Sequence, residues 1–286
     1  MTLPWGERTH VMGVLNLTPD SFSDGGRYTS LDRALRQSRR MVAEGAGILD
    51  LGGQSTRPGA EEVGPQEELR RLLPVLQALR AAIERGELAL APLLSVDTFH
   101  AAVAEAALAA GADWINDVRG ASRLRDPAML PLVARAGCPY VLMHSRGDST
   151  AMDGLAHYSD VVREVRDGLL AASEAAMAAG VQREQLIWDP GLGFAKTTEQ
   201  NLALLRGLPS LRAEGFPLLV GPSRKRFIGA VLDEPRPTAR IWGTAAVCAQ
   251  AITAGADVLR VHDVAPIAQT ARMTDAIVRT GPQPAA

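Results

Sequence analysis

The chain has 286 residues, a length that suits one large α/β barrel or two smaller domains. Hydrophobic residues make up 47% and charged residues 22% of the chain, which is ordinary for a soluble globular protein with a substantial core. The formal net charge of -2 excludes a general electrostatic attraction to nucleic acid or to an anionic membrane, so an anionic small molecule must be recognised locally.

Signals for export or membrane insertion are lacking in the sequence. The N-terminal segment MTLPWGERTH contains no apolar stretch of the kind found in signal peptides, and no apolar run reaches the roughly 18 residues that span a bilayer. Cys138 and Cys248 lie far apart in apolar surroundings, without the spacing of a metal site. We therefore expect two buried thiols in a reducing compartment, and a cytoplasmic protein that binds neither nucleic acid nor membrane.

The first apolar run, Val11–Leu17, has the length and composition of a buried strand. It gives way to a polar loop, residues 18–26, because proline and glycine end the strand. Asn16 and Asp20 offer hard oxygen ligands here, and Phe22 stands among polar residues. Such a loop is either an ordinary turn or a segment that closes over a ligand.

The same unit of an apolar strand, a polar loop and an amphipathic helix recurs to the end of the chain. Strands are predicted at residues 11–17, 48–51, 92–96, 114–115, 140–143, 186–188, 217–220 and 258–261. Helices are predicted after them, near residues 30–45, 69–83, 103–110, 127–136, 161–180, 197–205, 239–254 and 267–279. We expect Ser30 to cap the first helix and Pro74 to kink the second.

The alternation of these units decides the fold class. Strands separated by helices must run parallel, and eight such units favour a closed (β/α)8 barrel over an open sheet. No GxGxxG sequence follows the first strand, which argues against a dinucleotide-binding fold. We therefore predict an α/β protein with a single TIM-barrel domain over residues 1–286. Its core would run from about residue 10 to residue 280, between short flexible termini.

Polar residues follow the predicted strands, at the end where barrel enzymes place their catalytic groups. Each one alone is typical of a helix cap or a turn, but a ring of them on one face indicates a binding site. They are Asn16, Thr56, Asp97, Asn116, His144, Asp189, Lys225, Arg260 and His262.

The middle strands contribute one group of these residues. The carboxylates of Asp97 and Asp189 and the amide of Asn116 suit a flat heterocycle with several N–H donors. Lys225 would then donate to a carbonyl of that ring. The residue types thus predict a slot for a planar polar ring.

The first, second and eighth strands contribute the other group, and these strands become neighbours once the barrel closes. Arg260, His262 and the loop 55–57 combine cations, hydroxyls and backbone amides, which suits an anion. The side-chain oxygen of Asn16 can hold Mg²⁺ beside a polyphosphate. We therefore expect a phosphate or pyrophosphate at the edge of the ring.

At these positions the chain closely resembles the dihydropteroate synthase family of the folate pathway. NLTPDSFSDGG together with STRPG is the most specific part of the resemblance. The matching segments follow the family order over nearly the whole chain: GVLNLTPDSFSDGG (Gly13–Gly26), GGQSTRPGA (Gly52–Ala60), SVDT (Ser95–Thr98), IND (Ile115–Asp117), LMH (Leu142–His144), DPGLGFAKT (Asp189–Thr197), GPSRK (Gly221–Lys225), GTAA (Gly243–Ala246) and RVHDV (Arg260–Val264).

The resemblance implies an activity and its partners. The family condenses 6-hydroxymethyl-7,8-dihydropterin pyrophosphate with p-aminobenzoate to give 7,8-dihydropteroate and pyrophosphate. It uses Mg²⁺, adopts the barrel and is usually homodimeric, and sulfonamides compete with p-aminobenzoate. Its reaction is dissociative, so pyrophosphate leaves before the arylamine attacks. The site must therefore stabilise the leaving group and exclude water.

The resemblance also implies roles for single residues. Asn16 would ligate Mg²⁺, and the loop beyond it would be a lid that carries Phe22 to the substrate. The catalytic residues would be Phe22, Arg57, Asp97, Lys225, Arg260 and His262. Asp97, Asn116, Asp189 and Lys225 would hold the pterin, with Met143 and Phe194 lining its slot. Thr56, Arg57, Arg260 and His262 would bind the pyrophosphate. Phe22, Pro58, Ser223 and Lys225 would border p-aminobenzoate, and Gly221 would be a further substrate-binding residue.

The chain departs from the family pattern at a few positions. Gln54, Ala195 and Arg226 stand where the family usually has Glu, Gly and Ser, and the loop SRGDSTAMD after His144 is not the commonest version. Two alternatives therefore stay open. One is a non-catalytic pterin-binding paralogue. The other is a methyltetrahydrofolate:corrinoid methyltransferase of the same barrel group. Such an enzyme would have no use for the STRPG and SRK segments or for a Mg²⁺ site, which argues against this alternative.

Overall fold

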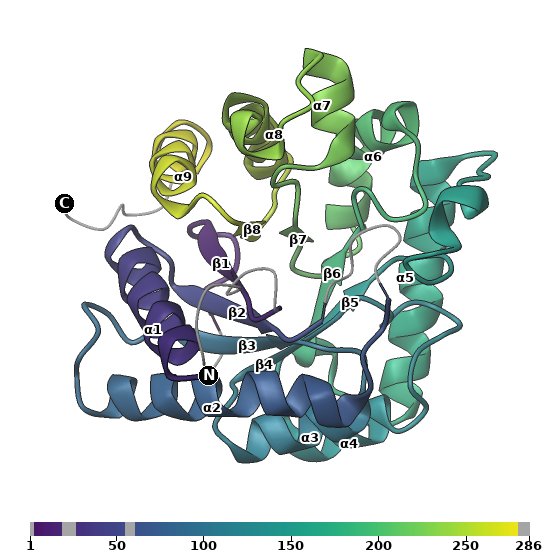
Figure 1. The fold of residues 1–286 in the computed structure, drawn as a ribbon. Helices are drawn as coiled ribbons and strands as arrows, with labels where there is room; N and C mark the ends of the chain where they lie inside the picture. Colours follow the sequence, from purple (N-terminus) through teal and green to yellow (C-terminus); the bar gives the residue numbers. More distant parts are fainter. Residues whose placement is uncertain (1–2, 19–26, 55–60, 280–286) are drawn as a thin grey trace.

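The computed structural model describes residues 3–18, 27–54 and 61–279. In these residues eight parallel strands form one sheet that curves into a barrel with helices outside it (Figure 1). The strands are β1 (His10–Asn16), β2 (Ile48–Gly52), β3 (Leu93–Asp97), β4 (Trp114–Asp117), β5 (Tyr140–Met143), β6 (Leu186–Asp189), β7 (Leu219–Val220) and β8 (Val258–Val261). The predicted TIM barrel is confirmed.

The barrel closes unevenly. β1 pairs with β2 on one side and with β8 on the other, so the two ends of the chain meet in the sheet. β7 is shorter than predicted, and it joins β6 through a single parallel bridge between Trp188 and Leu218. Pro217 has no N–H to extend β7, although its carbonyl oxygen accepts a hydrogen bond from Trp188 N at 2.9 Å. The contact between β6 and β7 is therefore a weak seam.

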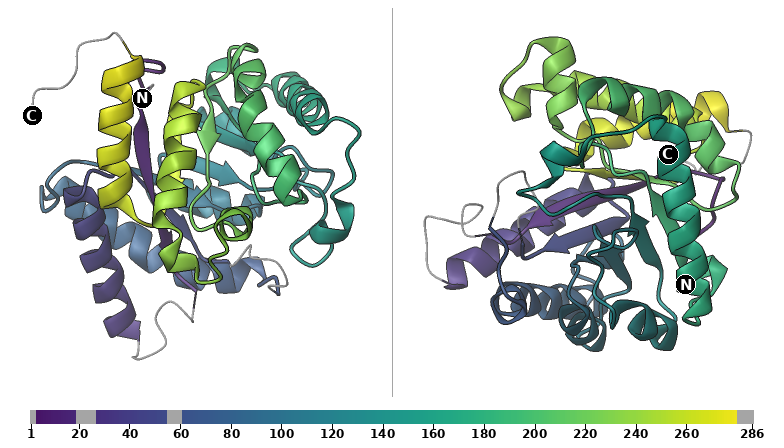
Figure 2. Two further views of the ribbon diagram at one scale, coloured as in Figure 1. Left: turned by 90° about the horizontal axis from the view of Figure 1, so that it is seen from above. Right: turned by 90° about the vertical axis from the view of Figure 1, so that its right-hand side faces the viewer.

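Helices follow the strands and cover the barrel on its outside, as both views of Figure 2 show. The described α-helices are α1 (Arg27–Ala43), α2 (Pro65–Glu84), α3 (Ala101–Ala109), α4 (Met129–Ala136), α5 (Val161–Ala178), α6 (Thr198–Arg212), α7 (Arg226–Leu232), α8 (Ile241–Thr253) and α9 (Val264–Val278).

The helices differ from the prediction at two points, the start of α1 and the presence of α7. α1 begins at Arg27, so Ser30 lies within the helix and the predicted cap was wrong. Pro74 lies within α2, and the kink expected there stays a prediction. α7 was not predicted, because its seven residues are too few to show a helical period and Gly229 interrupts them.

Inside the barrel, the side chains change character along the strands. Every second residue of a barrel strand points inward. Near the amino ends of the strands these residues are apolar and pack as one layer, which comprises Met12, Ile48, Trp114, Val141, Ile187, Leu219 and Val258. Two residues further along four of these strands, the inward positions hold Asp50, Asn116, Asp189 and Arg260, and Ser95 stands two residues after Leu93, which packs against the layer. These polar groups thus form a second layer at the carboxyl end of the barrel.

The outward residues of the strands pack against the helices. On α2, Leu72, Leu76 and Leu79 recur every three or four residues and are completely buried. Each such leucine stabilises the fold by about 1.5–3 kcal/mol. Cys138 and Cys248 are also buried, as predicted. Within the described residues, no helix has both the length and the apolar character to cross a membrane.

We expect Ile187→Ala to lower the free energy of unfolding by about 2–5 kcal/mol, because Ile187 is completely buried in the apolar layer and its truncation leaves a cavity. Urea denaturation followed by circular dichroism measures the change. Leu90→Ala, at a side chain that is 61% exposed, is the control and should cost less than about 0.5 kcal/mol. Equal losses for both variants would contradict the close packing of this layer.

Candidate active site

A cavity of about 760 Å³ opens at the carboxyl ends of the strands. Asn116, Met143 and Asp189 lie inside the barrel at this end and are only 2–5% exposed. The predicted residues that line the cavity itself are Asn16, Asp97, Phe194, Gly221, Ser223, Lys225, Arg260 and His262. The structure therefore brings seven members of the predicted ring together at this end: Asn16, Asp97, Asn116, Asp189, Lys225, Arg260 and His262.

Arg260, on β8, lies at the centre of a network on the inner wall. Its Nε donates to Oδ2 of Asp50 at 2.6 Å, and its Nη2 donates to Oδ2 of Asp97 at 2.6 Å. Burial works to lower the pKa of Arg260, but the charges of Asp50 and Asp97 outweigh it and raise the pKa above its usual value. The guanidinium is therefore held in place while its side chain, 22% exposed, still lines the cavity.

Asp97 faces both this network and the cavity. Burial raises the pKa of its carboxyl to about 7, and the nearby charge of Asp50 adds to the rise while Arg260 and Lys225 oppose it. Register explains part of the geometry, since Asp97 pairs with Asn116 across β3 and β4. The two pterin contacts expected from the sequence are thus adjacent.

Lys225, just before α7, reaches across the cavity floor. Its Nζ lies 4.2 Å from the centre of the Phe194 ring, in a cation–π contact. Burial lowers the pKa of Lys225 to about 8, against the attraction of Asp189. Asp189 accepts a hydrogen bond from the backbone N–H of Gly191 at 2.7 Å, and burial raises its pKa. A ring carbonyl and ring N–H groups would find complementary partners here.

The loop after β6 is fixed from beneath by Lys196. Its ammonium group donates to the carbonyl oxygens of Gly191 and Phe194, each at 3.0 Å, and lies 3.2 Å from Nδ1 of His144. Gly191 is required in this loop, because its φ is +69° and a β-carbon there would overlap the carbonyl oxygen of His144. His144 is therefore a buried support of the loop, and burial keeps its pKa well below its usual value.

His262 and its neighbours form the other wall. Nδ1 of His262 lies 3.0 Å from Oγ of Ser223. Burial lowers the pKa of His262 to about 3, with help from the charges of Arg224 and Arg260, so the imidazole is neutral at pH 7. Arg224 makes a two-bond ion pair with Asp263, at 2.6 and 2.9 Å. The cationic character of this wall therefore comes from the arginines.

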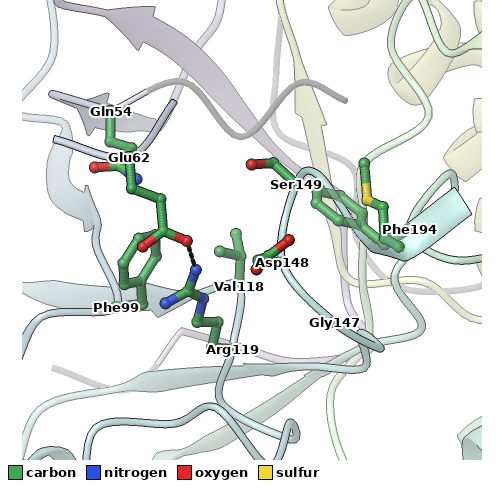
Figure 3. A pocket seen from close by; sticks show the side chains of 10 residues that line it. Gln54, Glu62, Phe99, Val118, Arg119, Gly147, Asp148, Ser149 and Phe194 are labelled. Carbon is green, nitrogen blue, oxygen red and sulfur yellow. Dashed lines mark hydrogen bonds and ion pairs between the residues drawn. The ribbon is translucent and has the colours of Figure 1, made fainter. Parts of the chain in front are cut away.

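A small pocket of about 30 Å³ adjoins the main cavity and shares Gln54, Met152 and Phe194 with it (Figure 3). Its apolar floor is continuous with Met143, since Phe99, Val118 and Met143 form a buried cluster against which Phe194 packs. The guanidinium of Arg119 lies 3.8 Å from the centre of the Phe99 ring and pairs with Glu62.

Other predicted residues lie outside the described part of the chain. They are Phe22, Thr56, Arg57 and Pro58, so their roles stay predictions. Asn16 is the last residue of β1 and lines the cavity. Among the described residues, no group of three or more His, Cys, Asp or Glu is placed to hold a metal ion.

Asp50, Ser95 and Lys196 were not predicted from the sequence. Asp50 was read as part of the apolar strand ILDL, yet the signal was present, because Asp50 stands two residues after the inward-facing Ile48. Ser95 follows the same rule on β3. Lys196 bonds mainly to backbone carbonyl groups, and no sequence pattern announces such contacts.

The structure describes the surroundings of the three residues that depart from the family pattern. Ala195 is completely enclosed and has a φ of +48°, a region that favours glycine. Gln54 accepts a hydrogen bond from the backbone N–H of Val63 at 3.1 Å. Arg226 pairs with Asp153 at 2.6 Å across the mouth of the cavity, and Asp153 belongs to the loop that also departs from the pattern.

Comparison with known proteins agrees with this geometry. The sequence model described as "Pterin binding enzyme" matches residues 12–262. The chain is 52% identical to the dihydropteroate synthase of Synechocystis sp. over 275 residues, which cover 96% of this chain and 92% of that protein. This chain belongs to the dihydropteroate synthase family of pterin-binding enzymes. The predicted family is therefore confirmed, and with it the class of transferases.

Solved members of the dihydropteroate synthase family have the same fold. The enzyme of Xanthomonas albilineans with 4-aminobenzoic acid superposes with a TM-score of 0.87 at 44% identity, covering 96% of this chain and 95% of that one. The enzyme of Yersinia pestis in a sulfonamide drug complex gives a TM-score of 0.87 at 40% identity, covering 97% of this chain and 99% of that one.

We expect pterin binding to weaken at acid pH, because the ring N–H predicted to bond to Asp97 would need its ionised carboxylate, and the pKa of Asp97 is about 7. Below that value the carboxyl is protonated, and the affinity should fall up to tenfold for each pH unit. Isothermal titration calorimetry with 6-hydroxymethylpterin between pH 5.5 and pH 8 measures this. Asp97→Asn should weaken binding and flatten the dependence. An acid limb that persists in this variant would assign the titration to another group.

Proposed function

We propose that this protein condenses 6-hydroxymethyl-7,8-dihydropterin pyrophosphate with p-aminobenzoate to give 7,8-dihydropteroate and pyrophosphate. The observation that carries the proposal is the single cavity face on which Asp97, Lys225 and Arg260 meet, with Asn116 and Asp189 directly inside the barrel. Ring-recognising groups and an anion-binding guanidinium are thus side by side. Membership of the dihydropteroate synthase family supports the same conclusion.

The pterin ring would occupy the slot between Lys225 and the apolar cluster. Asp189 has one carboxylate oxygen bonded to Gly191 N, which leaves the other for ring N–H groups. Lys225 would donate to the ring carbonyl. The apolar side chains of Met143 and Phe194 would cover the faces of the ring. Phe194 packs against the buried cluster that contains Met143. Gly221 lines the cavity near Arg260 without adding a side chain.

The pyrophosphate would lie against Arg260 and His262, with Thr56 and Arg57 proposed as further contacts. His262 is neutral before the ligand arrives, so it would donate an N–H rather than carry charge. Asn16 would hold Mg²⁺ together with pyrophosphate oxygens, which fits because Mg²⁺ commonly takes few protein ligands beside a substrate phosphate. That ion would offset the negative charge of the leaving group.

The reaction would be a dissociative substitution at the pterin methylene carbon. The C–O bond to pyrophosphate breaks first and leaves a cation, and the arylamine nitrogen then forms the C–N bond and loses a proton. The arginine-rich wall stabilises the departing charge. Ser223, together with Phe22 and Pro58, would border p-aminobenzoate, where sulfonamides would compete. Closure of the loop that carries Phe22 would exclude water from the cation.

The decisive experiment mixes the pterin pyrophosphate, labelled p-aminobenzoate and Mg²⁺ with the protein and measures labelled dihydropteroate. We expect product from the wild type. Asp189→Ala should abolish pterin binding and turnover, because the ring loses a buried charged acceptor. Asp167→Ala, the same change at an exposed position of α5, is the control and should behave like wild type. Retained pterin binding with no product would identify a non-catalytic binding protein.

We also propose that two copies of the chain form a homodimer through helices α7, α8 and α9, which lie side by side in Figure 1. These helices expose large apolar side chains, among them Trp242 (79% exposed), Met273 (63%) and Ile277 (70%). A second copy is the occupant that the family resemblance implies. An apolar surface of this kind is typical of an interface between copies.

Trp242→Ser should shift the protein from twice the mass of one chain to the mass of one chain, because aromatic residues dominate such interfaces. Light scattering after size exclusion, at several protein concentrations, measures the mass. Leu90→Ser removes a similarly exposed apolar side chain elsewhere and should leave the mass unchanged. A dimer that survives Trp242→Ser at every concentration would place the interface on another face.

A further inference from the structure

Asp50 lies on β2 inside the barrel, directly beneath the cavity, and is completely buried. Its register partner across β3 is Ser95, whose hydroxyl donates to Oδ1 of Asp50 at 2.6 Å. Oδ2 of Asp50 accepts two further hydrogen bonds, from Nδ2 of Asn116 at 3.1 Å and from Nε of Arg260 at 2.6 Å. One carboxylate thus joins four strands, β2, β3, β4 and β8.

The contact with Asn116 determines which way its amide faces. Because Nδ2 of Asn116 donates to Asp50, the oxygen Oδ1 lies at the other side of the amide group. A neutral amide could otherwise turn by 180° and exchange a donor for an acceptor. Asp50 therefore makes Asn116 present an acceptor, which is what a ring N–H requires.

The contact with Arg260 fixes the plane of the guanidinium. Asp50 holds Nε and Asp97 holds Nη2, so two carboxylates from neighbouring strands hold the fork at two points. Asp97 also faces the cavity, whereas Asp50 has no exposed surface. Of these two carboxylates, only Asp97 can meet a ligand.

We propose that Asp50 is a positioning residue for the condensation, which orients the amide of Asn116 and the guanidinium of Arg260 without touching either substrate. This inference rests on the proposed function. One buried carboxylate would then orient both the group that recognises the pterin, Asn116, and the group that stabilises the leaving group, Arg260. Removing that carboxylate should therefore disturb both steps, although neither substrate loses a direct contact.

A double-mutant cycle tests the action through Asn116. Asp50→Ala should weaken the binding of 6-hydroxymethylpterin at least tenfold, measured by calorimetry on protein with native circular dichroism. In an Asn116→Ala background the same substitution should weaken binding less than threefold, because the group that Asp50 orients is already absent. Equal losses in both backgrounds would overturn this half of the proposal.

Asp50→Asn tests the action on Arg260 and also decides the case if Asp50→Ala does not fold. Its amide oxygen still accepts from Asn116, so the pterin affinity should stay within threefold of wild type. The ion pair with Arg260 loses its carboxylate partner, which weakens the hold on the guanidinium, so kcat should fall at least tenfold. A wild-type kcat in Asp50→Asn would overturn the proposal.

Ser38→Ala is the control. Ser38 is as deeply buried as Asp50, but it lies on α1, where its hydroxyl donates to the carbonyl oxygen of Ala34 at 2.8 Å. This variant should lose stability but keep pterin affinity and kcat within threefold. A tenfold loss of either would show that general damage to the barrel explains the Asp50 effects. Product formation by the wild type is measured separately, so a failure of the proposed function is distinguishable from a failure of this inference.

Discussion

A guanidinium cannot give up its proton inside a protein, so a largely buried arginine requires negative charge beside it. Asp50 and Asp97 supply this negative charge to Arg260, and the polar groups in the carboxyl half of the barrel are arranged around these two ion pairs. Removing one partner of such a buried pair costs roughly 3–5 kcal/mol. The charges of the cavity are therefore in place before a substrate arrives, which is the condition for electrostatic catalysis.

The apolar layer beneath the site makes this arrangement possible. Its side chains fill the barrel near the amino ends of the strands, so the polar groups two residues further along stand on a packed floor. The loops above that floor are held differently. Lys196 fixes the loop after β6 by bonding to its carbonyl groups, and its burial lowers its own pKa to about 7. Strands thus position the inner groups, and buried polar contacts position the loops.

The fold was predictable because each strand is a short apolar run and each long helix carries a helical period. Most of the site was predictable for a related reason, since polar residues directly after apolar runs must gather at one end of a parallel barrel. Asp50 was missed because a single carboxylate inside an apolar run looks like an ordinary strand residue. α7 was missed because a helix of seven residues is too short to show a period. Arg260 bonds to two carboxylates on other strands. Those bonds depend on distances between strands, which no local sequence pattern contains.

The single bridge between Trp188 and Leu218 has a consequence for how binding and barrel integrity are related. Asp189 ends the strand on one side of this seam, and Lys225 follows the short strand on the other. A ring bound by both residues would connect the two sides of this seam, which few backbone hydrogen bonds join. The contacts that bind the ring would then also oppose local opening between β6 and β7. The barrel with a bound ring would therefore open less readily at this seam than the empty barrel.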